Sequence, residues 1–130
     1  MIGRRIAYNF AVVRVVPRVH VGTFANVGVL VHARTASFLG VRLLTEPSEL
    51  APLVRVADAE LLARYLRSLR GICEGRAEFG PVALAPPSER FHWLTAPRSD
   101  ILQSSPIHGG VCDDPARVLE ELHAEFVLTR

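Results

Sequence analysis

The sequence predicts an α+β domain in which two helices pack on one face of a mainly antiparallel sheet. Three observations lead to this fold class. Three apolar runs of strand length open the chain, two later segments have helical periodicity, and a pair of short strand-like runs lies between these segments. With 130 residues and no stretch typical of a linker, the chain is expected to form one domain over residues 1–130.

The N-terminal part of the predicted sheet is a three-stranded meander. Its strands are expected at 6–19, 27–33 and 38–44, which are rich in β-branched and aromatic residues. The short polar segment 34–37 suits a hairpin between the second and third strands. Within the second strand region, Gly28 is expected to permit a bulge or a close backbone contact.

Two further short strands are predicted between the helices. They are expected at 90–95 and 101–105, after the loop signals Gly80-Pro81 and Pro86-Pro87. In a strand over 90–95, alternate side chains would point to opposite faces, so that one face is core and the other is available for polar contacts.

The two helices are predicted from their capping residues and apolar spacing. The first begins with Asp58 as N-cap and ends at Gly71. Its apolar residues, at three- and four-residue intervals, are Leu61, Leu62, Tyr65, Leu66 and Leu69. The second begins at Asp114-Pro115, a cap followed by a first-turn proline. It is expected to bury Val118, Leu119, Leu122 and Phe126.

Composition disfavours several classes of function. Apolar residues make up 49% of the chain and charged residues 22%, which is ordinary for a globular domain. The net charge is only +2 and the arginines are spread along the chain, so a nucleic-acid binder is not favoured. No apolar stretch is long enough to span a bilayer, and the two cysteines form no disulfide framework. We therefore expect a cytoplasmic protein.

The polar segment 88–115 carries most of the reactive side chains. Its candidate catalytic residues are His92, His108, Cys112 and Asp113. Cys112 precedes a predicted helix N-terminus, which favours a thiolate, and either histidine could act as its base. The histidines and Cys112 could also ligate zinc, but the paired motifs of structural zinc sites are absent. No metal or other cofactor is predicted.

Anion recognition is the other chemistry that the residues indicate. Arg14 and Arg18 lie four apart on the first predicted strand, hence on one face, where they could grip a phosphate or carboxylate or could simply be solvated. The segment 104–110 is a hydroxyl-rich turn with two glycines. Such a turn can form an anion-binding concavity beside a helix N-terminus, or it can be only a sharp connection.

Two blocks of residues resemble a known family. The first block is Arg14-Val15-Val16-Pro17-Arg18 with Asn26-Val27-Gly28-Val29. The second is Glu89-Arg90-Phe91-His92-Trp93-Leu94 with Pro97-Arg98-Ser99, Gln103, Ser105-Pro106, His108 and Cys112-Asp113-Asp114-Pro115. Over nearly its whole length the chain resembles the bacterial family called domain of unknown function 3037.

The resemblance supplies candidate residues and a partner but no mechanism. It implies ligand-binding roles for Arg14, Arg18, Asn26, Arg90, Arg98, Ser99 and Gln103, to which the hydroxyl-rich turn adds Ser105. Members of the family are often encoded beside a HipA-type kinase-like protein, which implies a partner or a shared pathway. Where members tend to carry an acidic residue after the Pro-Arg pair, this chain has Val19-His20-Val21-Gly22.

Two functions therefore stand as hypotheses. The first is a binding or accessory module that holds an anionic group between Arg14, Arg18 and the segment 90–113, and that acts with a kinase-like partner. A homo-oligomer is left open. The second is a small hydrolase or transferase, with or without a metal, which requires the four candidate catalytic residues to converge in one cleft.

Overall fold

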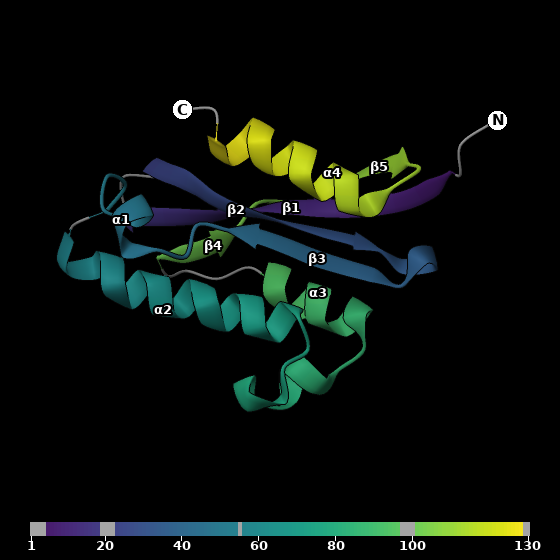
Figure 1. Ribbon diagram of the computed structural model, residues 1–130, viewed down its shortest axis with the longest axis horizontal. Coiled ribbons are helices and arrows are strands. Elements are labelled where there is room, and N and C mark those ends of the chain that lie inside the picture. Colours follow the sequence, from purple (N-terminus) through teal and green to yellow (C-terminus); the bar gives the residue numbers. More distant parts are fainter. Residues whose placement is uncertain (1–4, 19–22, 55, 97–100, 129–130) are drawn as a thin grey trace.

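The computed structural model describes residues 5–18, 23–54, 56–96 and 101–128, and it shows a five-stranded antiparallel sheet (Figure 1). Strands β1 (Ile6–Arg18), β2 (Thr23–Ala33) and β3 (Phe38–Leu43) form the predicted meander. The β2–β3 connection is the 3-10 turn η1 (Arg34–Ala36), which Ser37 closes in the left-handed region at φ 50°. The meander and its hairpin are thus confirmed.

The other edge of β1 is occupied by two short strands in succession. β4 (Leu102–Ser104) pairs with Val13 to Val15, and β5 (His108–Cys112) pairs with Ile6 to Phe10. The strand expected at 101–105 is confirmed. The expected turn over 104–110 is wrong in its second half, because Gly109 and Gly110 lie inside β5. At position 110 a Cβ would overlap the outer part of the Tyr8 ring across the sheet, so a larger residue there would displace that ring.

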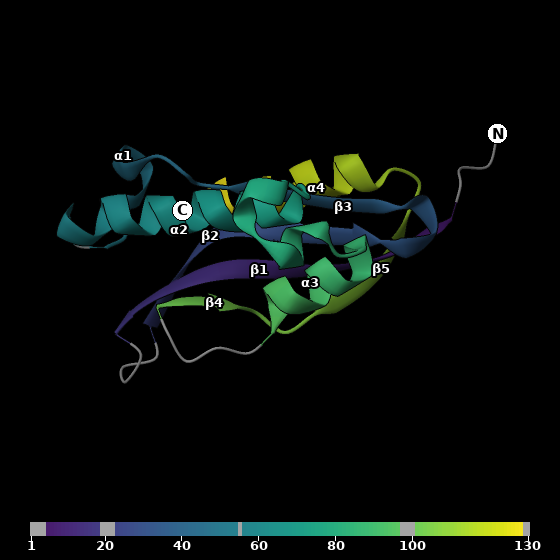
Figure 2. The same ribbon diagram turned by 90° about the horizontal axis from the view of Figure 1, so that it is seen from below.

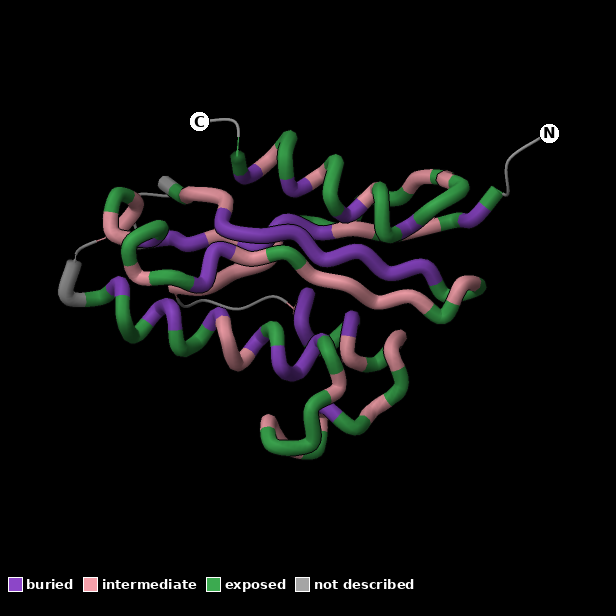
Figure 3. The backbone as a smooth tube through the Cα atoms, viewed as in Figure 1, coloured by how far each residue is buried: buried purple, intermediate pink, exposed green. Residues whose placement is uncertain are grey.

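Helices cover both faces of the sheet. α2 (Val56–Cys73) and α3 (Pro87–Thr95) lie on one face, and α4 (Pro115–His123) with its π-helical extension η4 (Ala124–Leu128) lies on the other (Figures 1 and 2). The short elements are α1 (Pro47–Leu50), η2 (Ala77–Phe79) and η3 (Pro81–Leu84). The α+β class is confirmed, but packing of both predicted helices on one face is wrong. β2 buries consecutive residues over positions 27–33 (Figure 3), so both of its sides need cover.

The segment predicted as a strand at 90–95 is the helix α3, so that prediction is wrong. Pro87 occupies the first helical position, where its fixed φ suits a helix start. Phe91, Leu94 and Thr95 are the buried residues of α3, a spacing of three and four that only a helix places on one side. Thr95 Oγ1 also donates a hydrogen bond of 2.8 Å to the Phe91 carbonyl one turn earlier.

The bounds of the first predicted helix also differ. α2 begins at Val56, so Asp58 lies in its first turn and is not the N-cap. It continues through Gly71 to Cys73, and Gly71 is a buried residue inside the helix, where a Cβ would overlap the Phe79 ring. Leu61 and Tyr65 are exposed and do not join the core. They line an apolar groove of about 510 Å³ that also includes Trp93.

The second predicted helix is confirmed at its start. The Asp114 carboxylate accepts hydrogen bonds from the backbone N–H groups of Ala116 and Arg117, and Pro115 follows as the first helical residue. Leu119 is buried, while Val118, Leu122 and Phe126 are half-buried. Within the described ranges, none of the helices is both long and apolar enough to cross a membrane.

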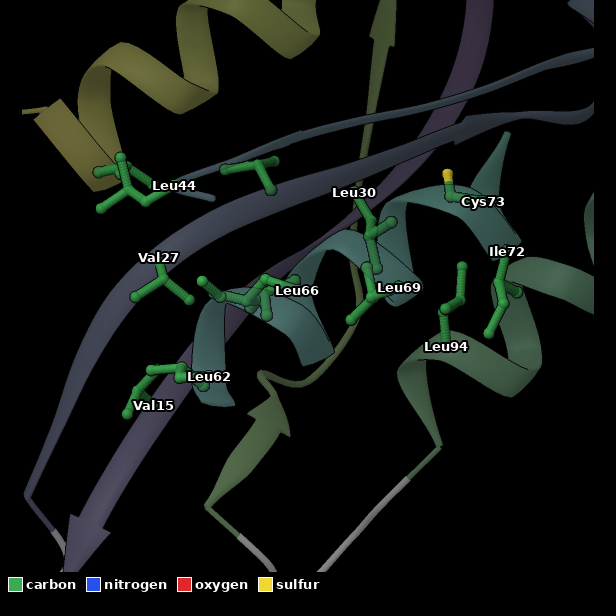
Figure 4. Packing of buried hydrophobic residues seen from close by; sticks show 14 of the residues in the cluster. Val15, Val27, Leu30, Leu44, Leu62, Leu66, Leu69, Ile72, Cys73 and Leu94 are labelled. Carbon is green, nitrogen blue, oxygen red and sulfur yellow. The ribbon is translucent and has the colours of Figure 1, made fainter. Parts of the chain in front are cut away.

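Helix α2 is held on its face of the sheet by a shared hydrophobic core. Figure 4 shows Leu62, Leu66 and Leu69 of α2 directed toward Val15, Val27 and Leu30 of the sheet. Each fully buried aliphatic side chain of this kind contributes roughly 1.5–3 kcal/mol to folding. Leu94 of α3 belongs to the same cluster, so α3 is fixed next to α2 on this face.

Candidate functional site

A cleft of about 560 Å³ opens where the first turn of α3 meets the β2–β3 hairpin. Its volume lies in the range of roughly 300–1,000 Å³ that is usual for ligand sites. The lining residues come from β1, β2, η1, α3 and the β4–β5 link: Ala7, Tyr8, Asn9, His32, Arg34, Thr35, Ser88, Phe91, His92 and Ile107. We call it the His32 cleft.

His32 is positioned by the strand it belongs to. It is the penultimate residue of β2 and pairs with Asn9 of β1 and Leu39 of β3. Because side chains alternate along a strand, His32 shares a face with the buried Leu30, on the side that α3 covers. Only 8% of His32 is exposed, and its ring packs on the Phe91 ring with 5.1 Å between centroids. The imidazole is therefore fixed at the base of the cleft.

Helix α3 contributes both a donor and a second imidazole. Ser88 is the second residue of the helix, and its Oγ lies 3.3 Å from His32 Nε2. His92 follows four residues later, hence on the same side of the helix, and it is exposed. The first-turn N–H groups of a helix have no partner within the helix and carry its positive dipole end. Ser88 places this end of α3 at the cleft.

The charges around His32 are positive. Burial lowers the pKa of His32 below its usual 6.5, and repulsion from His92 and Arg34 lowers it further. Both of these groups line the same cleft as His32. None of the described residues that line the cleft carries a carboxylate. An anion is the charge that this arrangement lacks.

The lowered pKa of His32 has a consequence for stability. Below 6.5 the unfolded chain binds more protons at this position than the folded chain, so the free energy of unfolding should fall as the pH falls. His32→Gln removes this titration, and we expect it to reduce the acid sensitivity. His123, whose pKa burial also lowers, retains part of the effect. The test compares urea midpoints at about pH 7.5 and about pH 5.5. Equal acid sensitivity in both proteins would contradict the expectation.

Three of the predicted ligand-binding residues form a row elsewhere on the sheet. Arg14 on β1 is flanked by Asn26 on β2 and Gln103 on β4. The Arg14 guanidinium lies over the Phe24 ring, 4.2 Å from its centroid. Asn26 Nδ2 donates a hydrogen bond of 3.0 Å to the carbonyl of Phe126 in η4. This row is therefore beside η4, and none of its members lines the His32 cleft.

The other predicted ligand-binding residues are framework groups or lie outside the description. Arg90 Nη1 donates a hydrogen bond to the Ala85 carbonyl, which ties α3 to the loop before it. Ser105 Oγ accepts a hydrogen bond from Val12 N–H and donates one to the Pro106 carbonyl, each 2.8 Å long. Arg98 and Ser99 fall outside the described residues, and so does the side chain of Arg18.

The four candidate catalytic residues are not brought together. His92 lines the His32 cleft, whereas the His108 ring packs on Phe10, 5.4 Å between centroids, on the face that η4 covers. Cys112 lies four residues further along β5, about 13 Å from His108 at the rise of an extended strand. Asp113 forms an ion pair with Arg117.

The structure gives no support to a reactive Cys112 thiolate or to the zinc site that was considered as an alternative. The pKa of Cys112 is raised, chiefly by loss of solvation, so a thiolate is disfavoured. Among the residues that the structure describes, no group of three or more His, Cys, Asp or Glu side chains could hold a metal ion.

Sequence reasoning missed His32, Arg34 and Asn9 as site residues. Of these three residues, His32 could have been noticed, because it is the single imidazole in the otherwise apolar strand run 27–33. Its association with Ser88, 56 positions away in the sequence, depends on where α3 packs.

A family model described as "Protein of unknown function (DUF3037)" matches residues 10–127 of the chain. No curated protein and no solved structure matches it. The matched region includes all lining residues of the His32 cleft except those at positions 7–9.

Proposed function

The chain belongs to the DUF3037 family, and we propose that it is a binding module that recognises an anionic group in the His32 cleft. The observation that carries this proposal is the gathering of Arg34, His92 and the buried His32 around one cavity, without a carboxylate among its described lining residues. Arg34 is a permanent cation, and its charge disfavours a proton on the buried His32 in the empty cleft. A bound anion offsets that charge.

The hydrogen-bond donors around the cleft are of types that bind anions. Arg34 supplies a guanidinium, which forms bidentate charge-assisted hydrogen bonds. Ser88 supplies a hydroxyl at the positive dipole end of α3. Anion recognition is the same chemistry that the sequence predicts. The proposed site, however, is the His32 cleft and not the surroundings of Arg14, and His92 belongs to both.

The double variant Arg34→Gln with His92→Gln should lose anion binding. The substitutions remove the guanidinium of Arg34 and the imidazole of His92 while keeping polar side chains, and a hydrogen bond to a charged group is worth about 1.5–3 kcal/mol. We expect affinity for inorganic phosphate, measured by isothermal titration calorimetry, to fall at least about tenfold. Unfolding midpoints should stay close to that of the unaltered protein, because both positions are exposed.

The matched control is Arg64→Gln, an exposed arginine of α2 outside the cleft lining. It removes the same charge from the protein and should leave phosphate affinity unchanged. If the control weakens binding as much as the double variant does, phosphate responds only to net charge and the cleft is not the site. If the unaltered protein binds neither phosphate nor sulfate, the proposal fails.

We also propose that the module acts with a kinase-like partner. The support is the gene neighbourhood that the family resemblance implies. Co-purification of the chain with a HipA-type protein encoded next to a member of the family tests this part separately. Absence of a complex at micromolar concentrations would remove the partner and leave the anion-binding proposal standing.

A further inference from the structure

We propose that the ligand of the His32 cleft is a phosphate monoester with an apolar or aromatic organic part. This inference rests on the proposed anion-binding function and narrows it to one class of compound. Two features of the lining carry it, namely the number and directions of the donors and the apolar wall beside them.

The donors surround the cavity from several elements. Arg34 follows the end of β2, Ser88 and His92 project from α3, and Asn9 reaches the cleft from β1. A carboxylate offers two oxygens and one negative charge to such a set. A phosphate monoester offers three strong acceptor oxygens and about −1.5 to −2 charges at neutral pH. Donors converging from three sides therefore suit the phosphate group better.

The cavity is larger than a phosphate group needs, and the remaining wall is apolar. Phe91 lies at its base, and Ala7 and Ile107 border it. Ile107 is a large apolar side chain that is 45% exposed, in the link between β4 and β5. Ligand sites combine a few polar groups that orient the ligand with apolar surface that buries its body. The organic part of the ester would lie against Ile107 and Phe91.

Three probes separate the two features of the proposed ligand. Phenyl phosphate carries both the phosphate and an aromatic body, inorganic phosphate carries only the first, and benzoate combines the body with a carboxylate. Dissociation constants are measured by calorimetry on the unaltered full-length chain. We expect phenyl phosphate to bind at least about tenfold more tightly than either of the others, since burial of an aromatic ring adds to the ionic contacts.

The other outcomes distinguish the failures. If inorganic phosphate binds as tightly as phenyl phosphate, the organic part has no site and this inference is overturned while anion binding stands. If benzoate equals phenyl phosphate, the phosphate group is not what the cleft selects, and the inference is again overturned. If no probe binds, the proposed function itself fails.

A variant pair tests the apolar wall directly. Ile107→Ser removes the wall at an exposed position, so the preference for phenyl phosphate over inorganic phosphate should fall by about fivefold. Val111→Ser is the control, because Val111 is an exposed aliphatic residue on the adjacent β5 outside the cleft lining. An unchanged preference in Ile107→Ser, or an equal fall in Val111→Ser, would refute contact between the organic part and Ile107.

Discussion

Replacing Phe91 with alanine is expected to destabilise the protein by about 3–5 kcal/mol, the usual cost of removing a buried aromatic ring. Only 2% of Phe91 is exposed. Its ring belongs to the main hydrophobic cluster and packs on His32, so its loss leaves a cavity between α3 and β2. Because the same ring forms the base of the His32 cleft, the variant should also lose anion affinity at temperatures where it remains folded.

Urea denaturation followed by circular dichroism measures the change in the free energy of unfolding. Trp93→Ala is the matched control, because Trp93 is an aromatic residue of the same helix that is 42% exposed. It should cost at least about 1 kcal/mol less than Phe91→Ala, because Trp93 lies outside the buried cluster and keeps part of its surface in water. Equal destabilisation by the two variants would mean that α3 is not anchored through Phe91.

Phe91 also shows where prediction from the sequence reaches its limit. Residues 90–95 are compatible with a strand by local composition, and a run of six residues is too short for its periodicity to decide. The deciding fact is that Phe91 and Leu94 are buried together, which is a property of tertiary packing. By contrast, the Asp114-Pro115 helix start could be predicted, because a cap is satisfied by backbone groups two and three residues away.

β5 could not be predicted from the sequence, because it too depends on tertiary packing. Gly109 and Gly110 are typical of turns, and Val111 is the single residue within 108–112 that favours a strand. The strand forms because Ile6 to Phe10 offer an edge for pairing, and glycine fits there because the Tyr8 ring occupies the space above position 110. The meander was predictable because its three strands follow one another along the chain with short connections.

Some residues of the candidate site could be predicted from the sequence, and others depend on how the elements pack. Ser88 and His92 lie in the polar segment 88–115, which the sequence analysis identifies as rich in reactive side chains, so the α3 side of the cleft could be predicted. His32 and Arg34 reach the cleft from the end of the second strand, through the packing of α3 against β2. Arg14, Asn26 and Gln103 do meet one another, because β1 pairs with both β2 and β4 at that point.

Gly28 is a position where the sequence predicted a bulge or a close backbone contact, and the structure confirms both. The pairing of β1 with β2 shifts there, with Val13 opposite Gly28 and Arg14 opposite Asn26. A Cβ on Gly28 would lie 2.6 Å from the backbone carbonyl oxygen of Arg42 and would overlap the Leu43 side chain. This carbonyl belongs to the hydrogen-bonded pairing of β2 with β3. It is therefore a backbone atom, which cannot move away from the added Cβ as the end of a side chain can.

Gly28→Ala should therefore cost about 3 kcal/mol, at the upper end of what overpacking of a core costs, because the strands must separate to admit one methyl group. Gly109→Ala is the control in another strand. A Cβ there would lie 3.3 Å from Oδ1 of the exposed Asn9 side chain, which can move, so the expected change is within about 0.5 kcal/mol. Both substitutions restrict the unfolded chain equally, so the difference between their urea unfolding free energies isolates the clash. Similar values for the two would show that β3 does not lie against Gly28 as closely as the Arg42 carbonyl requires.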